Sequence, residues 1–244
     1  MSGHSKWHNI QAKKGKTDAA RGKIFTKIGR ELAVCVKLGG PDPNTNSKLK
    51  DIIAKAKENN MPNDNIERSI KKASGELSSV NYEAINYEGY GVGGSAVIVE
   101  CLTDNKNRTA GDVRHAFDKH GGSLGTLGCV SYLFKNKGVV VLTEVKDVET
   151  LMMDAIELGA VDVEDSEETV EIFTEPNQHG QMRDALVAKG YNVVSADTLM
   201  LPDLYVDLDD EQMTKFQKML DDLDDLDDVQ EVYHNVNLPE EDEE

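Results

Sequence analysis

Apolar residues recur at helical spacing in three segments of the first 75 residues. This pattern predicts amphipathic helices over about 18–38 and 45–59, then a short third helix with Asp64 as its expected N-cap residue. In the first segment, the apolar stripe lies opposite a basic stripe made of Lys23, Lys27, Arg30 and Lys37. The sequence therefore predicts a helical N-terminal domain with one strongly basic surface.

The rest of the chain alternates β-branched runs with helical segments. Residues 138–202 contain six elements in the order β-α-β-β-α-β, which is typical of a ferredoxin-like unit. Before it we expect strands at 96–102 and 130–134 around a helix at 109–120, and after it a strand, a helix and a strand over 204–236. These outer elements would form a second, interrupted unit of the same kind.

The predicted fold class is therefore α+β, with an N-terminal helical domain followed by two ferredoxin-like α/β domains, one inserted in the other. The length of 244 residues allows two or three domains. The expected boundaries are 1–78 for the basic helical domain, 79–137 plus 203–238 for the interrupted domain, 138–202 for the inserted domain and 239–244 for an acidic tail.

Charge is distributed very unevenly along the chain. The whole chain has 27 Lys and Arg against 45 Asp and Glu, a net charge of −18. Residues 1–75 hold 16 of those cations and 7 of the anions, which leaves 11 cations and 38 anions for the remainder. A basic part on an otherwise acidic chain indicates contact with nucleic acid or with a membrane surface.

Cations suited to phosphate lie on the predicted helices, in the N-terminal arm and in the loop before the helix at 109–120. Such lysines can also be ordinary solvated residues, but only Asp18 and Glu31 are acidic among the first 40 residues. The candidate nucleic-acid-binding residues are Lys6, Trp7, Lys13, Lys14, Lys16, Arg21, Lys23, Lys27, Arg30, Arg68, Lys71, Lys72, Lys106 and Arg108.

Two of these candidates have alternative interpretations. Trp7, the only tryptophan, either stacks on a base or fastens the N-terminal arm to the helical domain. The turn at 60–63 between two helices resembles a helix-turn-helix in length, with Arg68, Lys71 and Lys72 on its second helix. A helical hairpin with a purely packing role explains that turn equally well.

Two glycine-rich segments resemble phosphate-binding loops. Residues 89–94 match G-x-G-x-x-G, but an apolar strand follows where a dinucleotide site needs a helix, so we expect a tight turn. Residues 121–128 could offer backbone N–H groups to phosphate, or could simply connect two elements.

Other function classes have little support. The cysteines Cys35, Cys101 and Cys129 lie far apart, and no apolar run approaches the ~20 residues that span a bilayer. The first residues lack the apolar core of a secretory signal, so we expect a cytoplasmic protein. The acidic run at 221–228 fits a solvated helix end better than a metal site. We expect no catalytic residues, metal, cofactor, small-molecule substrate or membrane contact.

Several short strings occur together along nearly the whole chain: Gly3 to Trp7, Arg21 to Lys27, Asn60 to Pro62 with Asn65 to Arg68, Tyr87 to Gly91, Thr103 to Asn105 with Asn107 to Thr109, and Gly121-Gly122 with Leu124-Gly125. In these strings the chain resembles the YebC/PmpR family. The resemblance implies one helical and two α/β domains. It also implies a role in gene expression, because members are described as DNA-binding transcriptional regulators, mitochondrial translational activators or factors in ribosomal elongation.

The sequence thus predicts a non-enzymatic nucleic-acid-binding regulator of gene expression. A DNA-binding transcriptional regulator is the favoured role. The alternative is a translation factor associated with ribosomal RNA, which scattered lysines and the weak recognition-helix signal would suit. The expected partner is DNA, rRNA in the ribosome, or both; the oligomeric state is not predicted.

Overall fold

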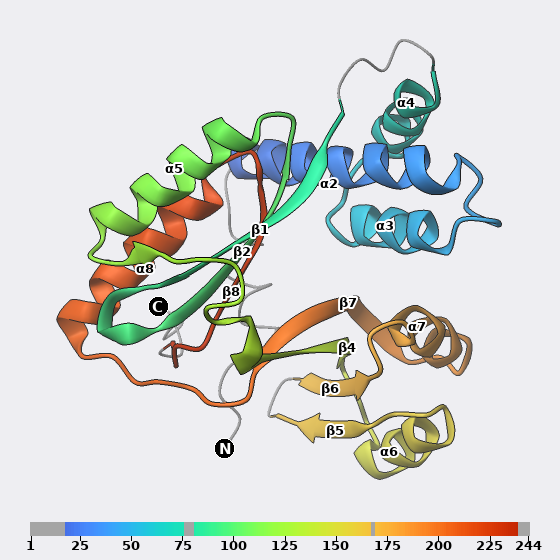
Figure 1. Ribbon diagram of the computed structural model, residues 1–244. Helices are drawn as coiled ribbons and strands as arrows, with labels where there is room; N and C mark the ends of the chain where they lie inside the picture. The colour runs from blue at the N-terminus through green and yellow to red at the C-terminus, as the bar shows by residue number, and fades with distance from the viewer. Residues whose placement is uncertain (1–17, 76–80, 167–168, 239–244) are drawn as a thin grey trace. The chain divides into compact units, whose positions relative to one another are not determined.

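The computed structural model describes residues 18–75, 81–166 and 169–238, and its N-terminal part is helical (Figure 1). The three helices are α2 (Asp18–Gly39), α3 (Ser47–Glu58) and α4 (Asn63–Ser74). The helices expected at 18–38 and 45–59 are confirmed. The expected N-cap of the third helix is wrong: α4 begins one residue before Asp64, directly after Pro62, and has no side-chain cap. Pro62 suits that place because its fixed φ is compatible with a helix start.

Helix α2 is the packing partner of both other helices (Figure 1). Ile28 and Leu32 from α2 are fully buried against Leu49 of α3 and Ile66 of α4. The turn from α2 into α3 is tied by Asn46, whose side-chain Nδ2 donates to two backbone carbonyls and whose Oδ1 accepts from the backbone N–H of Leu49. The apolar stripe read from the sequence is therefore the core of this domain.

A four-stranded antiparallel sheet follows, with strand order β3-β1-β2-β8 (Figure 1). Its strands are β1 (Glu83–Tyr90), β2 (Ala96–Thr103), β3 (Ser123–Leu124) and β8 (Val229–His234). Helices α5 (Lys106–Lys119) and α8 (Asp210–Asp224) lie side by side on one face of the sheet, where Phe117 and Phe216 are fully buried.

This sheet differs in detail from the expected interrupted unit. β1 is not among the expected strands, because Ile85 is the one β-branched residue among its eight and Gly89 interrupts it. The strand expected at 130–134 is instead a short 3-10 turn (Ser131–Leu133), and the one expected at 204–208 is a single bridge from Val206 to Val236. The unit therefore runs β-β-α-β, then α-β after the insertion.

Both glycine-rich segments connect elements within this sheet. The first forms the turn from β1 into β2, as predicted, with Gly93 and Gly94 at positive φ. The second is held by the buried Glu88, whose carboxylate accepts from the backbone N–H groups of Gly128, Val130 and Ser131. Burial by itself raises the pKa of Glu88, but these backbone donors outweigh it and the pKa is lowered. Within 121–128, the N–H of Gly128 is thus bound by this carboxylate and the N–H of Gly125 by the carbonyl oxygen of Glu88, which favours the connecting role.

The second sheet has strand order β5-β6-β4-β7 and is antiparallel throughout (Figure 1). Its elements are β4 (Phe134–Thr143), α6 (Val148–Glu157), β5 (Asp162–Asp165), β6 (Thr169–Thr174), α7 (His179–Ala188) and β7 (Asn192–Pro202). Leu142, Leu151, Ile172 and Leu186 fill its core. The β-α-β-β-α-β order predicted for this segment is confirmed.

The described residues group into two compact units. Phe134–Asp203 forms one, and Lys16–Leu133 together with Leu204–Asn237 forms the other. The helical domain and the first sheet therefore belong to one unit, which the chain leaves at Leu133 and re-enters at Leu204. Within the described ranges, no helix is long and apolar enough to cross a membrane.

We expect Leu32→Ala to lower the free energy of unfolding by about 2–5 kcal/mol, because it empties a fully buried site on α2. Leu38→Ala on the same helix is the matched control; Leu38 is 82% exposed, so its loss should stay within about 0.5 kcal/mol. Urea unfolding of both variants measures the difference. Equal losses would contradict the assigned burial of the α2 stripe.

Candidate nucleic-acid interface

The structure describes nine of the fourteen predicted nucleic-acid-binding residues. The other five lie outside the described residues: Lys6, Trp7, Lys13, Lys14 and Lys16. Their assignment stays a prediction. The nine described ones lie on α2, on α4 and at the start of α5.

The basic stripe of α2 faces the acidic end of α8 rather than open solvent. Lys23 Nζ lies 2.7 Å from Asp225 Oδ1, and Lys27 Nζ lies 2.8 Å from Asp224 Oδ1. The Lys27 side chain is only 12% exposed, so its ammonium is largely desolvated by the contact. The expectation of an exposed face is wrong for Lys27, whereas the Lys23 side chain keeps 41% exposure beside its aspartate.

Arg30, one turn further along α2, is the most deeply engaged of these cations. Its Nη1 donates to Asp228 Oδ1 at 2.5 Å and to the carbonyl oxygen of Leu102 at 3.1 Å. The guanidinium carbon also lies 5.3 Å from the ring centre of Tyr82, a cation–π distance. Arg30 is thus part of the packing between α2 and the first sheet.

The carboxylate of Asp228 accepts hydrogen bonds from side chains of several elements. Besides Arg30, its carboxylate accepts from Arg108 Nη2 at 2.7 Å, from the Thr109 hydroxyl at 2.7 Å and from the Thr103 hydroxyl at 3.2 Å. The side chain is 8% exposed. Burial alone raises the pKa of Asp228, yet the hydrogen bonds from Arg108, Thr109 and Arg30 lower it from 3.8 to about 2. We call Asp228 and the four side chains that donate to it the Asp228 joint.

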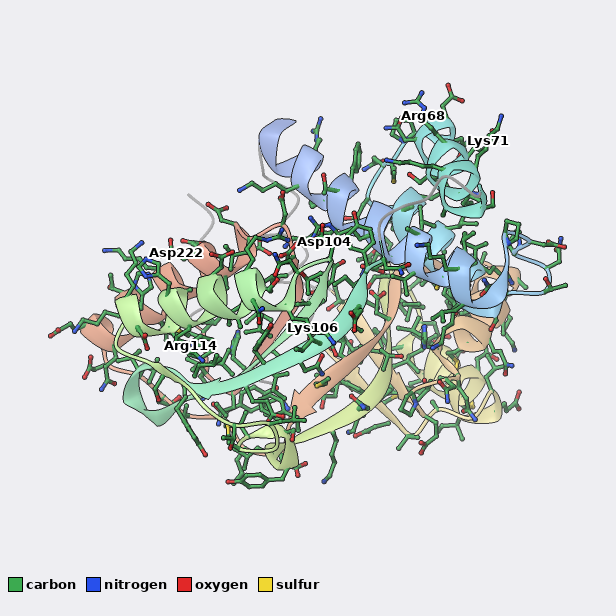
Figure 2. The ribbon with its side chains drawn as sticks, turned by 45° about the horizontal axis from the view of Figure 1, so that its top comes forward. Arg68, Lys71, Asp104, Lys106, Arg114 and Asp222 are labelled. Carbon is green, nitrogen blue, oxygen red and sulfur yellow. The ribbon has the colours of Figure 1, made fainter. Side chains whose placement is uncertain are left out.

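The basic loop before α5 is also internally paired. Lys106 Nζ lies 2.5 Å from Glu83 Oε2, and Arg108 bridges Asp228 and Asp104. Asp104 and Lys106 sit together where α5 begins (Figure 2). Lys106 remains half exposed, since 51% of its side chain is accessible. The side chain of Arg108, by contrast, is committed to two carboxylates.

Helix α4 carries three exposed cations of the predicted set. Arg68, Lys71 and Lys72 are exposed, and among the described residues no carboxylate forms an ion pair with any of the three. Arg68 and Lys71 project outward from α4 (Figure 2). Arg21, at the start of α2, is exposed as well but is not free of partners. Accessible positive charge in the helical domain therefore lies on α4, and also on α3 at Lys48 and Lys57 and at the two ends of α2.

The packing of α4 disfavours the helix-turn-helix interpretation. Both α3 and α4 pack mainly on α2 and touch each other little. In a helix-turn-helix, the second helix lies in the major groove and the first crosses the DNA backbone, so the two helices act as a pair. The turn at 60–63 is better described as part of a three-helix packing around α2.

Sequence reasoning missed Asp224, Asp225 and Asp228 as partners of the basic helix. The acidic run was interpreted as a solvated helix end, which fits Asp221 and Asp227 but not Asp228. The sequence signal that could have indicated this pairing is the opposite charge of the basic helix and the acidic run at 221–228. It could suggest attraction, although not which carboxylate meets which cation.

Comparison with known proteins agrees with this architecture. Residues 5–76 match the TACO1/YebC protein N-terminal domain, and residues 82–236 match the TACO1/YebC second and third domain. The chain belongs to the TACO1/YebC family. The predicted family and the α+β fold class are therefore confirmed.

Members of the TACO1/YebC family align with almost the whole chain. A probable transcriptional regulatory protein of Clostridium botulinum (strain Eklund 17B / Type B) is 61% identical over 242 residues, which cover 98% of each chain. One from Hathewaya histolytica is 58% identical with the same coverage. A crystal structure of a conserved hypothetical protein from Aquifex aeolicus is 46% identical and superposes with a TM-score of 0.83, covering 93% of this chain and 94% of that one.

Replacing Asp228 tests the joint. Asp228→Asn leaves the largely buried Arg30 without its carboxylate, so we expect the free energy of unfolding to fall by about 3 kcal/mol or more at neutral pH. The matched control is Asp227→Asn, an exposed neighbour with the same charge change.

The pH dependence of that difference gives a second measurement. Because the folded-state pKa of Asp228 is lowered to about 2, its stabilisation is present above the ordinary value of 3.8 and is lost as pH falls toward 2. Urea unfolding from pH 7 downward should show the two variants converging by about 2 kcal/mol. A constant gap at all pH values would contradict the assigned role of the carboxylate.

Proposed function

We propose that this TACO1/YebC family member is a non-enzymatic regulator of gene expression that binds nucleic acid through its N-terminal helical domain. The observation that carries the proposal is the trio Arg68, Lys71 and Lys72, which stays exposed on α4. Three cations of α2, by comparison, form internal ion pairs: Lys23, Lys27 and Arg30. Phosphate contact by such cations supplies most of the non-specific affinity of nucleic-acid-binding proteins.

The names of the relatives support a regulatory role in transcription. Several are called probable transcriptional regulatory proteins at 57–61% identity. On this basis, transcription regulation through DNA binding is the first candidate for this chain. The described chain carries nothing that favours a reaction over binding, so we propose no catalytic step. The proposed location is the cytoplasm, where nucleic acid of either kind is accessible.

A translation factor that binds ribosomal RNA is the second candidate. The specific observation in its favour is the packing of α4 on α2, which does not present a conventional recognition helix to a major groove. Proteins of this kind read the backbone and the irregular shape of folded RNA. Lys6, Trp7, Lys13, Lys14 and Lys16 stay candidate contacts for either kind of nucleic acid.

The charge of α4 gives a direct test. Lys71→Ala with Lys72→Ala should weaken binding of the full chain to nucleic acid several-fold and reduce the slope of log affinity against log salt by about 2 on duplex DNA. Stability should change little, because exposed lysines in the last turn of a helix contribute only about 0.3–1 kcal/mol each through the helix dipole. Fluorescence anisotropy at several salt concentrations measures the affinity.

The control removes the same charge elsewhere. Lys146→Ala with Lys218→Ala changes two exposed lysines outside the helical domain. This control should bind like the unmodified protein. If both double variants lost equal affinity and equal slope, only net charge would matter, and α4 would not be the interface. Running duplex DNA and rRNA fragments in parallel separates the two candidate targets.

A further inference from the structure

A small cavity opens between α2 and α4, next to the exposed cations of α4. Its volume is about 250 Å³. Two segments far apart in the sequence meet there, one from α2 and one from the turn into α4. The lining residues are Phe25, Thr26, Met61, Asn65, Arg68 and Ser69.

The cavity is shallow and open, and its lining combines polar side chains with two apolar ones, Phe25 and Met61. Met61 is buried, with 6% exposure, and Phe25 is half-buried on the edge of the helical core. An aromatic ring beside a thioether offers a flat, polarisable surface, on which a planar ring stacks favourably. Any base can use such a surface, because every nucleobase has a π face.

Polar groups surround this apolar surface. Asn65 and Ser69 are half-buried on α4, and neither side chain hydrogen-bonds to another described residue. The amide of Asn65 has both donors and an acceptor, which suits the mixed edge of a base. The hydroxyl of Thr26, by contrast, already donates to the carbonyl oxygen of Gly22.

The positive charge at the rim of the cavity favours an anionic ligand. Arg68 lines the cavity and is exposed, and Lys71 lies one turn further along the same helix (Figure 2). The exposed acids Asp64 and Glu67 lie on α4 too, but the cations outnumber them there. A guanidinium at the mouth of such a cavity can hold a phosphate while the attached ring lies inside.

The volume of the cavity indicates the size of the ligand. The cavity is smaller than the roughly 300 Å³ at which pockets for drug-sized ligands begin. A volume of this size accommodates one ring system. A base stacked inside a duplex cannot reach such a cavity, so the target strand must present the base unstacked.

We propose that this cavity receives one unstacked nucleobase of a single-stranded or looped nucleic acid. The base lies against Phe25 and Met61, its edge meets Asn65, and its phosphate meets Arg68. This inference rests on the proposed nucleic-acid binding and adds the form of the target, which is single-stranded at the point of contact.

The test compares Asn65→Ala with Asn63→Ala in the full chain. Asn63 is exposed at the start of α4 and does not line the cavity, so it is a matched control. The probes are a fluorescein-labelled single-stranded RNA of about 12 nucleotides, the DNA strand of the same sequence, and the corresponding DNA duplex. Melting temperatures confirm that both variants are folded.

We expect Asn65→Ala to weaken binding of the single strands about tenfold, with an unchanged salt slope, since a neutral base contact is lost. Duplex affinity should stay within about twofold, and Asn63→Ala should change none of the three affinities. Equal losses for RNA and DNA strands mean that the base and phosphate are read; a loss confined to RNA means that the 2′-hydroxyl contributes as well. Both results support the proposal.

Arg68→Gln is a second variant, because this exposed side chain can change without disturbing the core. It should weaken single-strand binding and reduce the salt slope by about 1. If Asn65→Ala bound single strands normally while the unmodified protein bound them well, the cavity would not hold a base and would be left to another partner, such as a protein segment. If the unmodified protein bound none of the three probes, the proposed function itself would fail.

Discussion

One buried carboxylate connects the helical domain to the first sheet. Asp228 accepts hydrogen bonds from Arg30 on α2, from Arg108 and Thr109 on α5, and from Thr103 at the end of β2. Removing water from a carboxylate is costly, and it is tolerated here because several donors, two of them charged, surround it. The placement of α2 beside the sheet depends on this group, and β8 begins directly after it.

The joint changes how the charge of the chain should be interpreted. The basic N-terminal region and the acidic remainder are not two independent surfaces, because Asp224, Asp225 and Asp228 neutralise one stripe of α2. The exposed pair Lys23–Asp225 adds little free energy, while the buried Arg30–Asp228 contact determines the geometry. The exposed cations of α4 remain available to an external anion, as do Lys48 and Lys57 of α3. On α4, Arg68 lines a cavity to which Phe25 and Met61 contribute apolar surface.

The interrupted architecture is consistent with this arrangement. The chain leaves the unit that contains the first sheet at Leu133 and re-enters it at Leu204, and α8 and the acidic segment come only after the inserted unit. The residues that hold α2 in place are therefore about 200 positions away from it in sequence, as with Lys27 and Asp224. A second buried carboxylate, that of Glu88, fixes the end of the second glycine-rich segment and the residues after it. It accepts hydrogen bonds from three backbone N–H groups.

The sequence by itself determined the elements whose information is local. Periodic apolar residues specified α2 and α3, and the strand-helix order of 138–202 specified the inserted unit, because hydrophobic spacing follows directly from helix and strand geometry. Weakly patterned β1 and the irregular segment at 204–208 were not predictable, since tertiary pairing decides them. The candidate site divides in the same way: sequence identified the basic residues, but only the tertiary structure decided which stay exposed. Lys27 and Lys71 look alike as residues, and they differ because an aspartate from the other end of the chain reaches Lys27 alone.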